Sequence, residues 1–476
     1  MNATRWLPTC LGLVVLAACK DLDVGNLNSP NLDDFVNNPT RSQVLSVASG
    51  LLFGTRVGIA AQNGYVSLLG ILGRESYNFD PADPRFVTEM LVGPLDGGSP
   101  AFGGNLWANP YRNIRNGNLE LAALTKVPLV ADAEKEAIRG FTQTIQALDY
   151  LQVMNTRDAN GAGIPTDLDP LAPPAAIVTK DAVFAHIERL LDSAQAHLDS
   201  ATFLEGGGLA FPFELSPGFD GFTTTASFRG FNRALRARVL VYLGSFGCTA
   251  CWDSALTALS ASFIDTTASL NVGVYHSYAT VSGDEQNTLF DPKARAIVAH
   301  PSLETDAQLQ TGGAKDDRFV RKTEPLANPK TTQGLTTQLQ FTIYNSNVDP
   351  IPIIRNEELI LLRAEANIGK GGAVDLAAAV ADINVIRIKS GKLPAYAGAV
   401  TQPALLDELL YNRRYSLMFE GGHRWIDLRR YGRLGTLPTE ATSNGAAKRF
   451  AKFPFPAFDC DARSTKPAGC GTEVGF

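Results

Sequence analysis

The sequence is poor in the residues that most catalytic and nucleic-acid-binding proteins need. Its 476 residues include only five His, six Cys and four Trp, and 42 Lys and Arg face 48 Asp and Glu. A net charge of −6 disfavours nucleic-acid binding, which normally requires a basic face. Metalloprotease, hydrolase and phosphate-loop motifs are absent. These absences favour binding over catalysis, and we predict neither a cofactor nor a metal site.

The composition nevertheless suits a folded protein. Hydrophobic residues make up 45% of the chain and charged residues 19%, which excludes a disordered chain of low hydrophobicity and high net charge. No stretch after the N-terminus approaches 18 uninterrupted apolar residues, so we expect no membrane-spanning helix. The 43 Gly and 27 Pro predict long loops between the ordered elements.

The N-terminus has the pattern of an export signal. Arg5 precedes an apolar stretch, residues 11–16, that is too short to span a bilayer, which takes about 20 residues. It ends in Leu-Ala-Ala-Cys19, which resembles a bacterial lipobox. We predict a lipoprotein signal peptide over residues 1–18, lipidation of Cys19 and a lipidated tether over residues 19–39. A plain secretory signal cleaved after Ala18 is the alternative.

Four cysteines remain once Cys10 leaves with the signal and Cys19 is lipidated: Cys248, Cys251, Cys460 and Cys470. An even number in an exported chain suggests two disulfides. Sequence proximity favours Cys248–Cys251 and Cys460–Cys470 over the two crossed pairings. The Cys-Thr-Ala-Cys spacing also fits a redox or metal half-site, but zinc normally takes four ligands, and no companion ligands lie at a useful spacing.

Helical periodicity dominates the remaining chain, and the helices come in pairs with short turns between them. Helices paired in this way stack as solenoid-like hairpins. We predict one domain over residues 40–476, with a loop-rich insert over residues 263–349 and short strands near residues 335–343. The expected helices are Thr40–Gly58, Asn105–Lys126, Ala131–Asn155, Thr179–Ala201, Ala226–Leu243, Trp252–Ser262, Asn356–Gly369, Ala373–Ser390 and Gln402–Leu434.

Three segments of the C-terminal third carry family-like motifs. Residues 350–366, beginning Pro-Ile-Pro-Ile-Ile-Arg, are followed by Ile-Asn-Val-Ile-Arg at 383–387 and by Phe-Glu-Gly-Gly-His-Arg-Trp-Ile-Asp-Leu-Arg-Arg at 419–430. Together they resemble the conserved segments of the SusD/RagB family of outer-membrane nutrient-binding lipoproteins. The lipobox and the Trp-x-x-x-Tyr pattern at Trp107 also fit. Asn412 and Ser416 depart from the family, which usually has Glu at these positions.

The resemblance implies a fold and a function. It implies an all-α body of about four tetratricopeptide-like helix hairpins, with minor β structure and a loop-rich region that binds the ligand. It also implies a lipid-anchored protein on the outer membrane, facing the cell surface, whose partner is a TonB-dependent (SusC-like) barrel. The expected function is capture of oligosaccharides, or alternatively peptides or other nutrients, for delivery to that transporter.

Several charged residues near the C-terminus could be mistaken for catalytic groups. If Glu420 and Asp427 share one helix face, about 10 Å separates them, more than the ~5–9.5 Å of glycosidase carboxylate pairs. Arg424 has the helical spacing to pair with either. We therefore interpret Glu420, Arg424, Asp427 and Arg430 as an ion-pair ladder that fixes the last helix. For His423 we expect a capping or packing role.

Aromatic and polar clusters in loops are the candidate ligand contacts, because sugars and peptides bind to flat aromatic faces with a few fixed polar groups. Trp107, Trp252 and Trp425 fall on predicted helices, where a core position is expected. Each loop cluster could instead pack its own loop. The candidate contact residues are Arg74, Tyr77, Asn78 and Phe79 in one cluster, and Tyr275 and Tyr278 in the other.

Two other functions remain open at this stage. A cell-envelope polysaccharide hydrolase would need an acid pair built from loop carboxylates such as Glu75 and Asp80. A helical-repeat scaffold that binds only proteins would lack a concave, aromatic-lined pocket among the loops.

Overall fold

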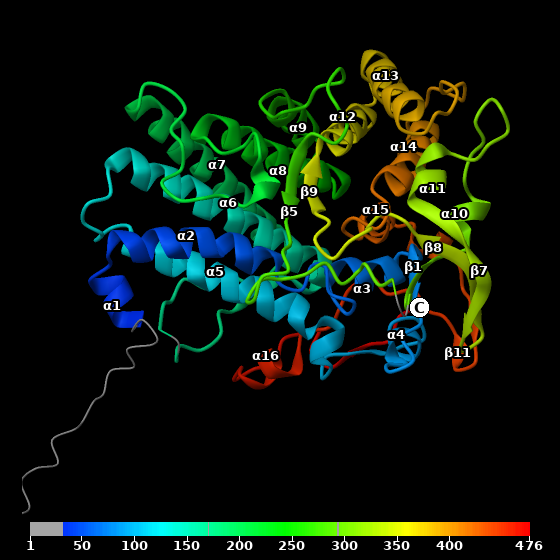
Figure 1. The fold of residues 1–476 in the computed structure, drawn as a ribbon, viewed down its shortest axis with the longest axis horizontal. Coiled ribbons are helices and arrows are strands. Elements are labelled where there is room, and N and C mark those ends of the chain that lie inside the picture. The colour runs from blue at the N-terminus through cyan, green and yellow to red at the C-terminus, as the bar shows by residue number, and fades with distance from the viewer. Residues whose placement is uncertain (1–31, 170, 293–294) are drawn as a thin grey trace, which may run out of the picture.

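The computed structural model describes residues 32–169, 171–292 and 295–476, which are mainly helical (Figure 1). The predicted signal peptide, the predicted lipidation site Cys19 and most of the predicted tether lie outside these residues. Within them, no helix is long and apolar enough to cross a membrane. The helices are α1 (Leu32–Asn37), α2 (Arg41–Arg56), α3 (Tyr65–Leu72), α4 (Arg85–Thr88), α5 (Asn105–Ala123), α6 (Asp132–Arg157), α7 (Lys180–Leu204), α8 (Thr225–Ser245), α9 (Cys251–Ser260), α10 (Ser302–Thr305), α11 (Asp317–Lys322), α12 (Asn356–Lys370), α13 (Ala373–Lys389), α14 (Gln402–Ser416), α15 (His423–Arg430) and α16 (Ala457–Asp461).

The long helices pack side by side as antiparallel neighbours. Helices α6 and α7, α8 and α9, and α12 and α13 form consecutive hairpins, while α2 packs against α5. Capping residues lie at the start of two of these helices, at the positions that the sequence predicts. The Thr179 side chain accepts from the Ala182 backbone N–H, and Thr40 forms a capping box with Gln43. The predicted helical fold class is confirmed.

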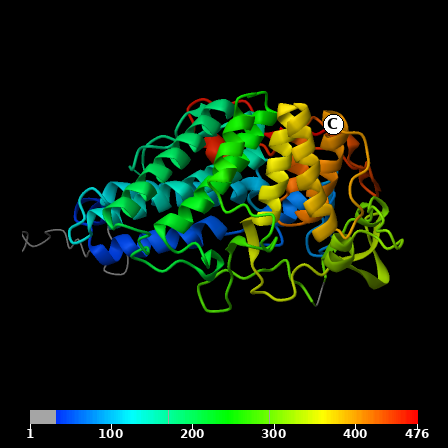
Figure 2. The same cartoon turned by 90° about the horizontal axis from the view of Figure 1, so that it is seen from above.

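One face of the helical frame carries most of the irregular chain. Seen from above, the segments between α8 and α12 gather on one side of the helices (Figure 2). The core runs between the helices and beneath these segments. Trp107, Trp252 and Trp425 are buried in it, as expected for core positions.

The strands are short and form separate two-stranded antiparallel pairs. The longest pair, β7 with β8, is a hairpin within the insert, and β8 occupies the segment where strands are predicted. The strands β5 and β9 pair beside α8 and α12, with Gly273 opposite Arg355 and His276 opposite Ile351. The strands are β1 (Ser76–Asn78), β2 (Leu95–Asp96), β3 (Ala162–Gly163), β4 (Ile177–Val178), β5 (Gly273–His276), β6 (Ile297–Ala299), β7 (Thr323–Thr332), β8 (Leu335–Phe341), β9 (Ile351–Arg355), β10 (Ala441–Thr442), β11 (Gly445–Ala446) and β12 (Thr472–Glu473).

The helix predicted over Gln402–Leu434 is in fact broken. Helix α14 ends at Ser416, and α15 begins only at His423. Between them Phe419 has φ 56° and Gly422 has φ 69°, a left-handed conformation that a continuing α-helix cannot contain. A Cβ on Gly422 would lie 2.3 Å from Leu69 Cβ. The two adjacent glycines were the signal for this break.

The break also removes the pairs through Arg424 from the predicted ion-pair ladder. Glu420 lies before α15 and pairs with Arg355 and Lys322. Arg424 donates to the Arg74 carbonyl oxygen at 3.1 Å, and neither Glu420 nor Asp427 is its partner.

One pair of the predicted ladder, Asp427 with Arg430, is present, and Asp427 also binds Arg413, which the ladder did not include. Its carboxylate accepts from Arg413 on α14 at 2.6 Å and from Arg430 on α15 at 2.7 Å.

The departures at Asn412 and Ser416 are accommodated by one buried cation. Arg318 donates to Asn412 Oδ1 and to Ser416 Oγ, each at 3.0 Å, and its charge is neutralised by Asp316 at 2.6 Å. Because Asp316 supplies the negative charge, a glutamate on α14 is not needed.

Both disulfides that proximity favoured are present. Cys248 is joined to Cys251 at the start of α9, and Cys460 in α16 is joined to Cys470. Neither pair lies among other metal-ligating side chains, since no group of three or more such residues occurs in the described ranges.

Candidate ligand-binding site

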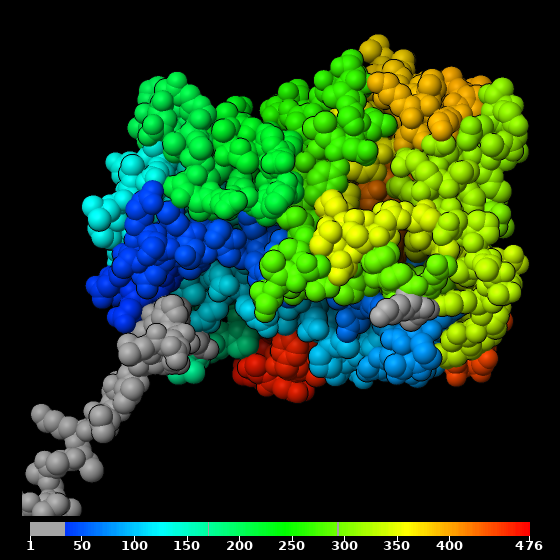
Figure 3. Space-filling view, in the orientation of Figure 1, coloured from blue at the N-terminus to red at the C-terminus, as the bar shows by residue number. Residues whose placement is uncertain are grey.

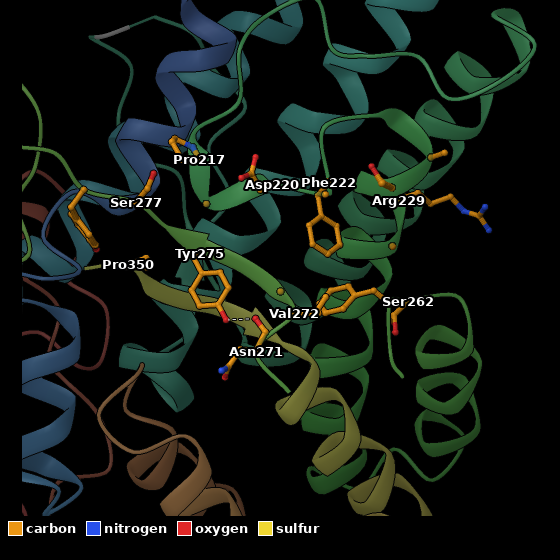
Figure 4. Close-up of a pocket in the computed structure, with 18 of the residues that line it drawn as sticks. Pro217, Asp220, Phe222, Arg229, Ser262, Asn271, Val272, Tyr275, Ser277 and Pro350 are labelled. Atoms are coloured by element: carbon orange, nitrogen blue, oxygen red, sulfur yellow. Dashed lines mark hydrogen bonds between the residues drawn. The ribbon is translucent and has the colours of Figure 1, made fainter. Parts of the chain in front are cut away.

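A cavity of about 910 Å³ opens where four segments meet. Its walls are the turn at residues 217–222, the first turns of α8, the end of α9 with residues 261–263, and β5 with the residues that flank it (Figure 4). On the surface, the segments of the insert lie next to the N-terminal helices (Figure 3). We call the 910 Å³ cavity the central pocket. Its volume falls within the usual range for small-molecule sites, ~300–1,000 Å³.

Aromatic rings from separate loops line the central pocket. Phe222 and Phe263 pack edge to face, with ring centroids 4.9 Å apart. Tyr275 projects from β5 into the same pocket, with its hydroxyl turned toward Asn271 (Figure 4). Phe222 belongs to the Gly/Phe-rich loop before α8, whereas Phe263 and Tyr275 come from the start of the insert. This arrangement offers ring surface to a ligand with flat or weakly polar faces.

The two predicted tyrosines of the second cluster both line the central pocket. The Tyr275 hydroxyl donates to the Asn271 carbonyl oxygen at 2.5 Å, which holds the ring in place. Tyr278 is buried, and its hydroxyl has no hydrogen-bond partner among the described residues. Burial raises the pKa of both hydroxyls, so both stay protonated at neutral pH.

Few charged groups face the central pocket. Of the described residues that line it, Asp220 is the only acid and Arg229 the only base. Arg229 lies 3.2 Å from Asp199, and both side chains are partly exposed. A single carboxylate does not make the acid pair that glycosidases use.

The turn that holds Phe222 is shaped by a close backbone approach. A Cβ on Gly218 would lie only 1.9 Å from the Tyr275 carbonyl oxygen, so a side chain here would push the turn off β5. Phe219 is buried and packs on Phe228 and Phe231 of α8. The irregular loop is thereby anchored to the helical frame at the position where it meets the pocket.

The first predicted cluster lies elsewhere and has a structural role. Tyr77, Asn78 and Phe79 are buried, and none of them lines the central pocket. Arg74 is fully buried, and its Nε lies 3.1 Å from Glu440. The Tyr77 hydroxyl is 3.0 Å from His300 Nε2. These contacts tie β1 to the insert and to the C-terminal segment, so that of the two predicted clusters only the one with Tyr275 and Tyr278 lines the central pocket.

The structure does not bring together Glu75 and Asp80, the acid pair named for the hydrolase alternative. Glu75 is buried in the core, where its Oε1 accepts from the Phe419 backbone N–H at 3.1 Å. Asp80 Oδ1 instead accepts from the Ala82 backbone N–H in a turn. Neither carboxylate lines the central pocket.

Residues 317–467 match the model of the SusD family. The resemblance to the SusD/RagB family is confirmed. The match covers the three motif segments and the helices α11 to α16. No curated protein matches the sequence.

Solved structures extend the likeness in fold to almost the whole chain. A SusD superfamily protein from Bacteroides vulgatus aligns with a TM-score of 0.63 and 14% identity, over 91% of this chain and 98% of its own. Bacteroides fragilis NanU gives a TM-score of 0.61 and 16% identity, over 93% and 99%. A laminarin-binding SusD-like protein gives 0.57 and 17%, over 90% and 99%. At these identities the likeness establishes the fold alone.

Proposed function

We propose that this SusD-like protein is a surface lipoprotein that binds oligosaccharides and delivers them to a TonB-dependent outer-membrane transporter. It carries out no chemistry on them. The observation that supports this most directly is the central pocket, which brings Phe222, Phe263, Tyr275 and Tyr278 together on a helical frame. A scaffold that binds only proteins would not need such a pocket.

The lining of the central pocket suits a neutral ligand with apolar faces and hydroxyl edges. Ring faces can pack on the C–H faces of a sugar, and the Tyr275 hydroxyl, which donates its proton to Asn271, can still accept from a sugar hydroxyl. One acid and one base line the pocket, so it has no excess charge that would require a charged ligand. Among the structural neighbours, one is named for binding laminarin, a polysaccharide.

Calorimetric titration of residues 20–476 against a panel of oligosaccharides and peptides tests this proposal. We expect one class of oligosaccharide to bind, and Tyr275→Ala to weaken that binding about tenfold, which corresponds to ~1.4 kcal/mol. Phe458→Ala is the matched control, because Phe458 is an exposed aromatic on α16 outside the central pocket. Binding of peptides alone, or of nothing in the panel, would refute the oligosaccharide proposal.

Membrane attachment and the transporter are tested separately. We expect Cys19→Ala to shift the protein from the outer-membrane fraction to the soluble fraction, because the lipid is the proposed anchor. We also expect the wild-type lipoprotein, extracted in mild detergent, to co-purify with a barrel protein. Purification of the lipoprotein alone under these conditions would count against the transporter partner.

A further inference from the structure

One insert segment lines both the central pocket and a second, smaller cavity. The second cavity has a volume of about 260 Å³, and we call it the amide pocket. The segment spans residues 277–285: Ser277 lines the central pocket and Glu285 lines the amide pocket. Arg56 of α2 holds this segment, because it donates to the Ser277 carbonyl oxygen and pairs with Asp284.

The amide pocket is assembled from parts of the chain that are distant in sequence. A compact turn after α2 supplies one wall. Gly58 has φ 75°, and a Cβ on Gly64 would lie 2.0 Å from the Gly58 carbonyl oxygen, so both ends of the turn require glycine. Asn63 lies within this turn. Asn105 and Asn109, four residues apart on α5, form the opposite wall on one helix face.

The polar side chains around the amide pocket have unused hydrogen-bonding capacity. Within the described residues, the side chains of Asn63, Asn105 and Glu285 make no hydrogen bond. Asn109 donates through Nδ2 to the Val57 carbonyl oxygen at 3.2 Å, which leaves its Oδ1 as an acceptor. Gln152 donates through Nε2 to the Thr55 carbonyl oxygen, also at 3.2 Å.

Apolar groups complete the lining of the amide pocket. Ile59, Leu106 and the Tyr65 ring are buried side chains at its surface. The Tyr65 hydroxyl accepts from Asn155 Nδ2 at 2.9 Å, so this ring is fixed before any ligand arrives. A preorganised apolar surface surrounded by donors and acceptors is the usual construction of a small-ligand site.

The chemistry of the lining restricts the ligand. No Lys or Arg is among the described residues that line the amide pocket, which disfavours an anion, and Glu285 is its single acid, which disfavours a metal ion. Amide groups both donate and accept, which matches hydroxyl groups that do the same. The volume lies just below the range of drug-sized ligands, ~300–1,000 Å³, and therefore suits about one ring.

We propose that the amide pocket is a second binding site that takes a single neutral, polyhydroxylated ring, such as a monosaccharide or one terminal unit of a glycan. The site is built from residues other than those of the central pocket. It therefore goes beyond the proposed function and does not depend on the ligand of the central pocket.

Saturation-transfer NMR with glucose, galactose, mannose and N-acetylglucosamine as separate probes tests the proposal. Three variants of residues 20–476 are compared with the wild type. Asn105→Leu removes an amide and places an apolar side chain at the amide pocket. Asn116→Leu is the matched control, an exposed asparagine on the same helix outside this pocket. Ser262→Trp obstructs the central pocket. Thermal melting of each variant checks that it is folded.

We expect at least one monosaccharide to give a signal that survives Ser262→Trp and Asn116→Leu and falls at least fivefold in Asn105→Leu. A signal that is lost in Ser262→Trp and unchanged in Asn105→Leu would overturn the second site and leave the proposed function intact. Oligosaccharide binding without a signal from any monosaccharide would also overturn it. The absence of both kinds of binding would refute the second site together with the proposed function.

Discussion

Arg355 and Glu420, 65 residues apart in sequence, form a buried two-point ion pair. Arg355 Nη2 donates to Glu420 Oε1 at 2.9 Å, and Nε donates to Oε2 at 3.1 Å. Each residue belongs to one of the C-terminal motif segments. Burial alone would raise the pKa of Glu420, but the charges of Arg355 and Lys322 lower it below its ordinary value. The pair therefore joins the end of β9 to the break between α14 and α15.

We predict that Glu420→Gln lowers the free energy of unfolding by about 3–5 kcal/mol, because Arg355 keeps its pairing with Glu357 but one buried cation is left uncompensated. Chemical denaturation at pH 7 measures the change. Asp461→Asn, which removes an exposed pairing with Lys466, is the control and should cost less than about 1 kcal/mol. Equal losses in the two variants would contradict a special role for the buried pair.

We expect Glu120 to make the free energy of unfolding depend on pH. It is fully buried in α5, neither carboxylate oxygen has a hydrogen-bond partner in the part of the chain that the structure describes, and burial raises its pKa from 4.5 to about 9. A carboxyl whose pKa is raised by folding contributes its full stability below pH 4.5 and loses it as the pH rises toward 9. At pH 7 the loss relative to acid is on the order of 3 kcal/mol.

We therefore expect Glu120→Met to be more stable than the wild type at pH 8 and to flatten the decline of stability between pH 5 and 9. Urea denaturation across this range measures both effects. Glu214→Met, at an exposed loop position, is the control and should follow the wild-type curve. An unchanged slope in Glu120→Met would show that this carboxyl does not titrate as described.

Gly422 and Gly432 both have a left-handed backbone, and substituting each one distinguishes the cost of a steric clash from the cost of backbone strain. Gly422 has φ 69° and Gly432 has φ 65°, but only at Gly422 would a Cβ collide with another residue. We predict that Gly432→Ala costs about 1 kcal/mol from the backbone conformation alone. Gly422→Ala should cost about 1–3 kcal/mol more, because Leu69 has to move. Thermal unfolding measures both, and similar losses would contradict the clash.

The two disulfides should differ in their contribution to stability. Cys460 and Cys470 close a loop ten residues long, whereas Cys248 and Cys251 are three apart. A longer loop restricts the unfolded chain more. We predict that the double substitution Cys460→Ala with Cys470→Ala costs about 2–3 kcal/mol, and that the pair at Cys248 and Cys251 costs less. Denaturation under non-reducing conditions compares the two, and the reverse order would contradict this reasoning.

The helical frame was predictable because its signals are local. The Thr179 cap and the apolar stripe that follows it place α7 to within a few residues, and β8 follows from alternation in the insert. The break before α15 was missed because apolar periodicity was given more weight than Gly421 and Gly422. Two adjacent glycines indicate the end of a helix, and this signal should outweigh an apolar pattern that continues past them.

The site was only partly predictable because its residues meet through tertiary packing. Tyr275 was found by its aromatic neighbourhood, but nothing in the sequence places Phe222 beside Phe263, which lie in different loops. The cluster at Arg74 has the same composition as a ligand site and is nevertheless buried, since Glu440 and His300 come to it from remote segments. Composition identifies candidate groups, and packing decides which of them remain accessible.

Arg56 occupies a position with consequences for how the lining of the two cavities can vary. One guanidinium anchors the segment that the two cavities share to a long, well-packed helix. Residues elsewhere in either cavity can therefore be exchanged independently while this segment stays in place. Substitutions can then reshape one cavity at a time, provided that the contacts of Arg56 are kept.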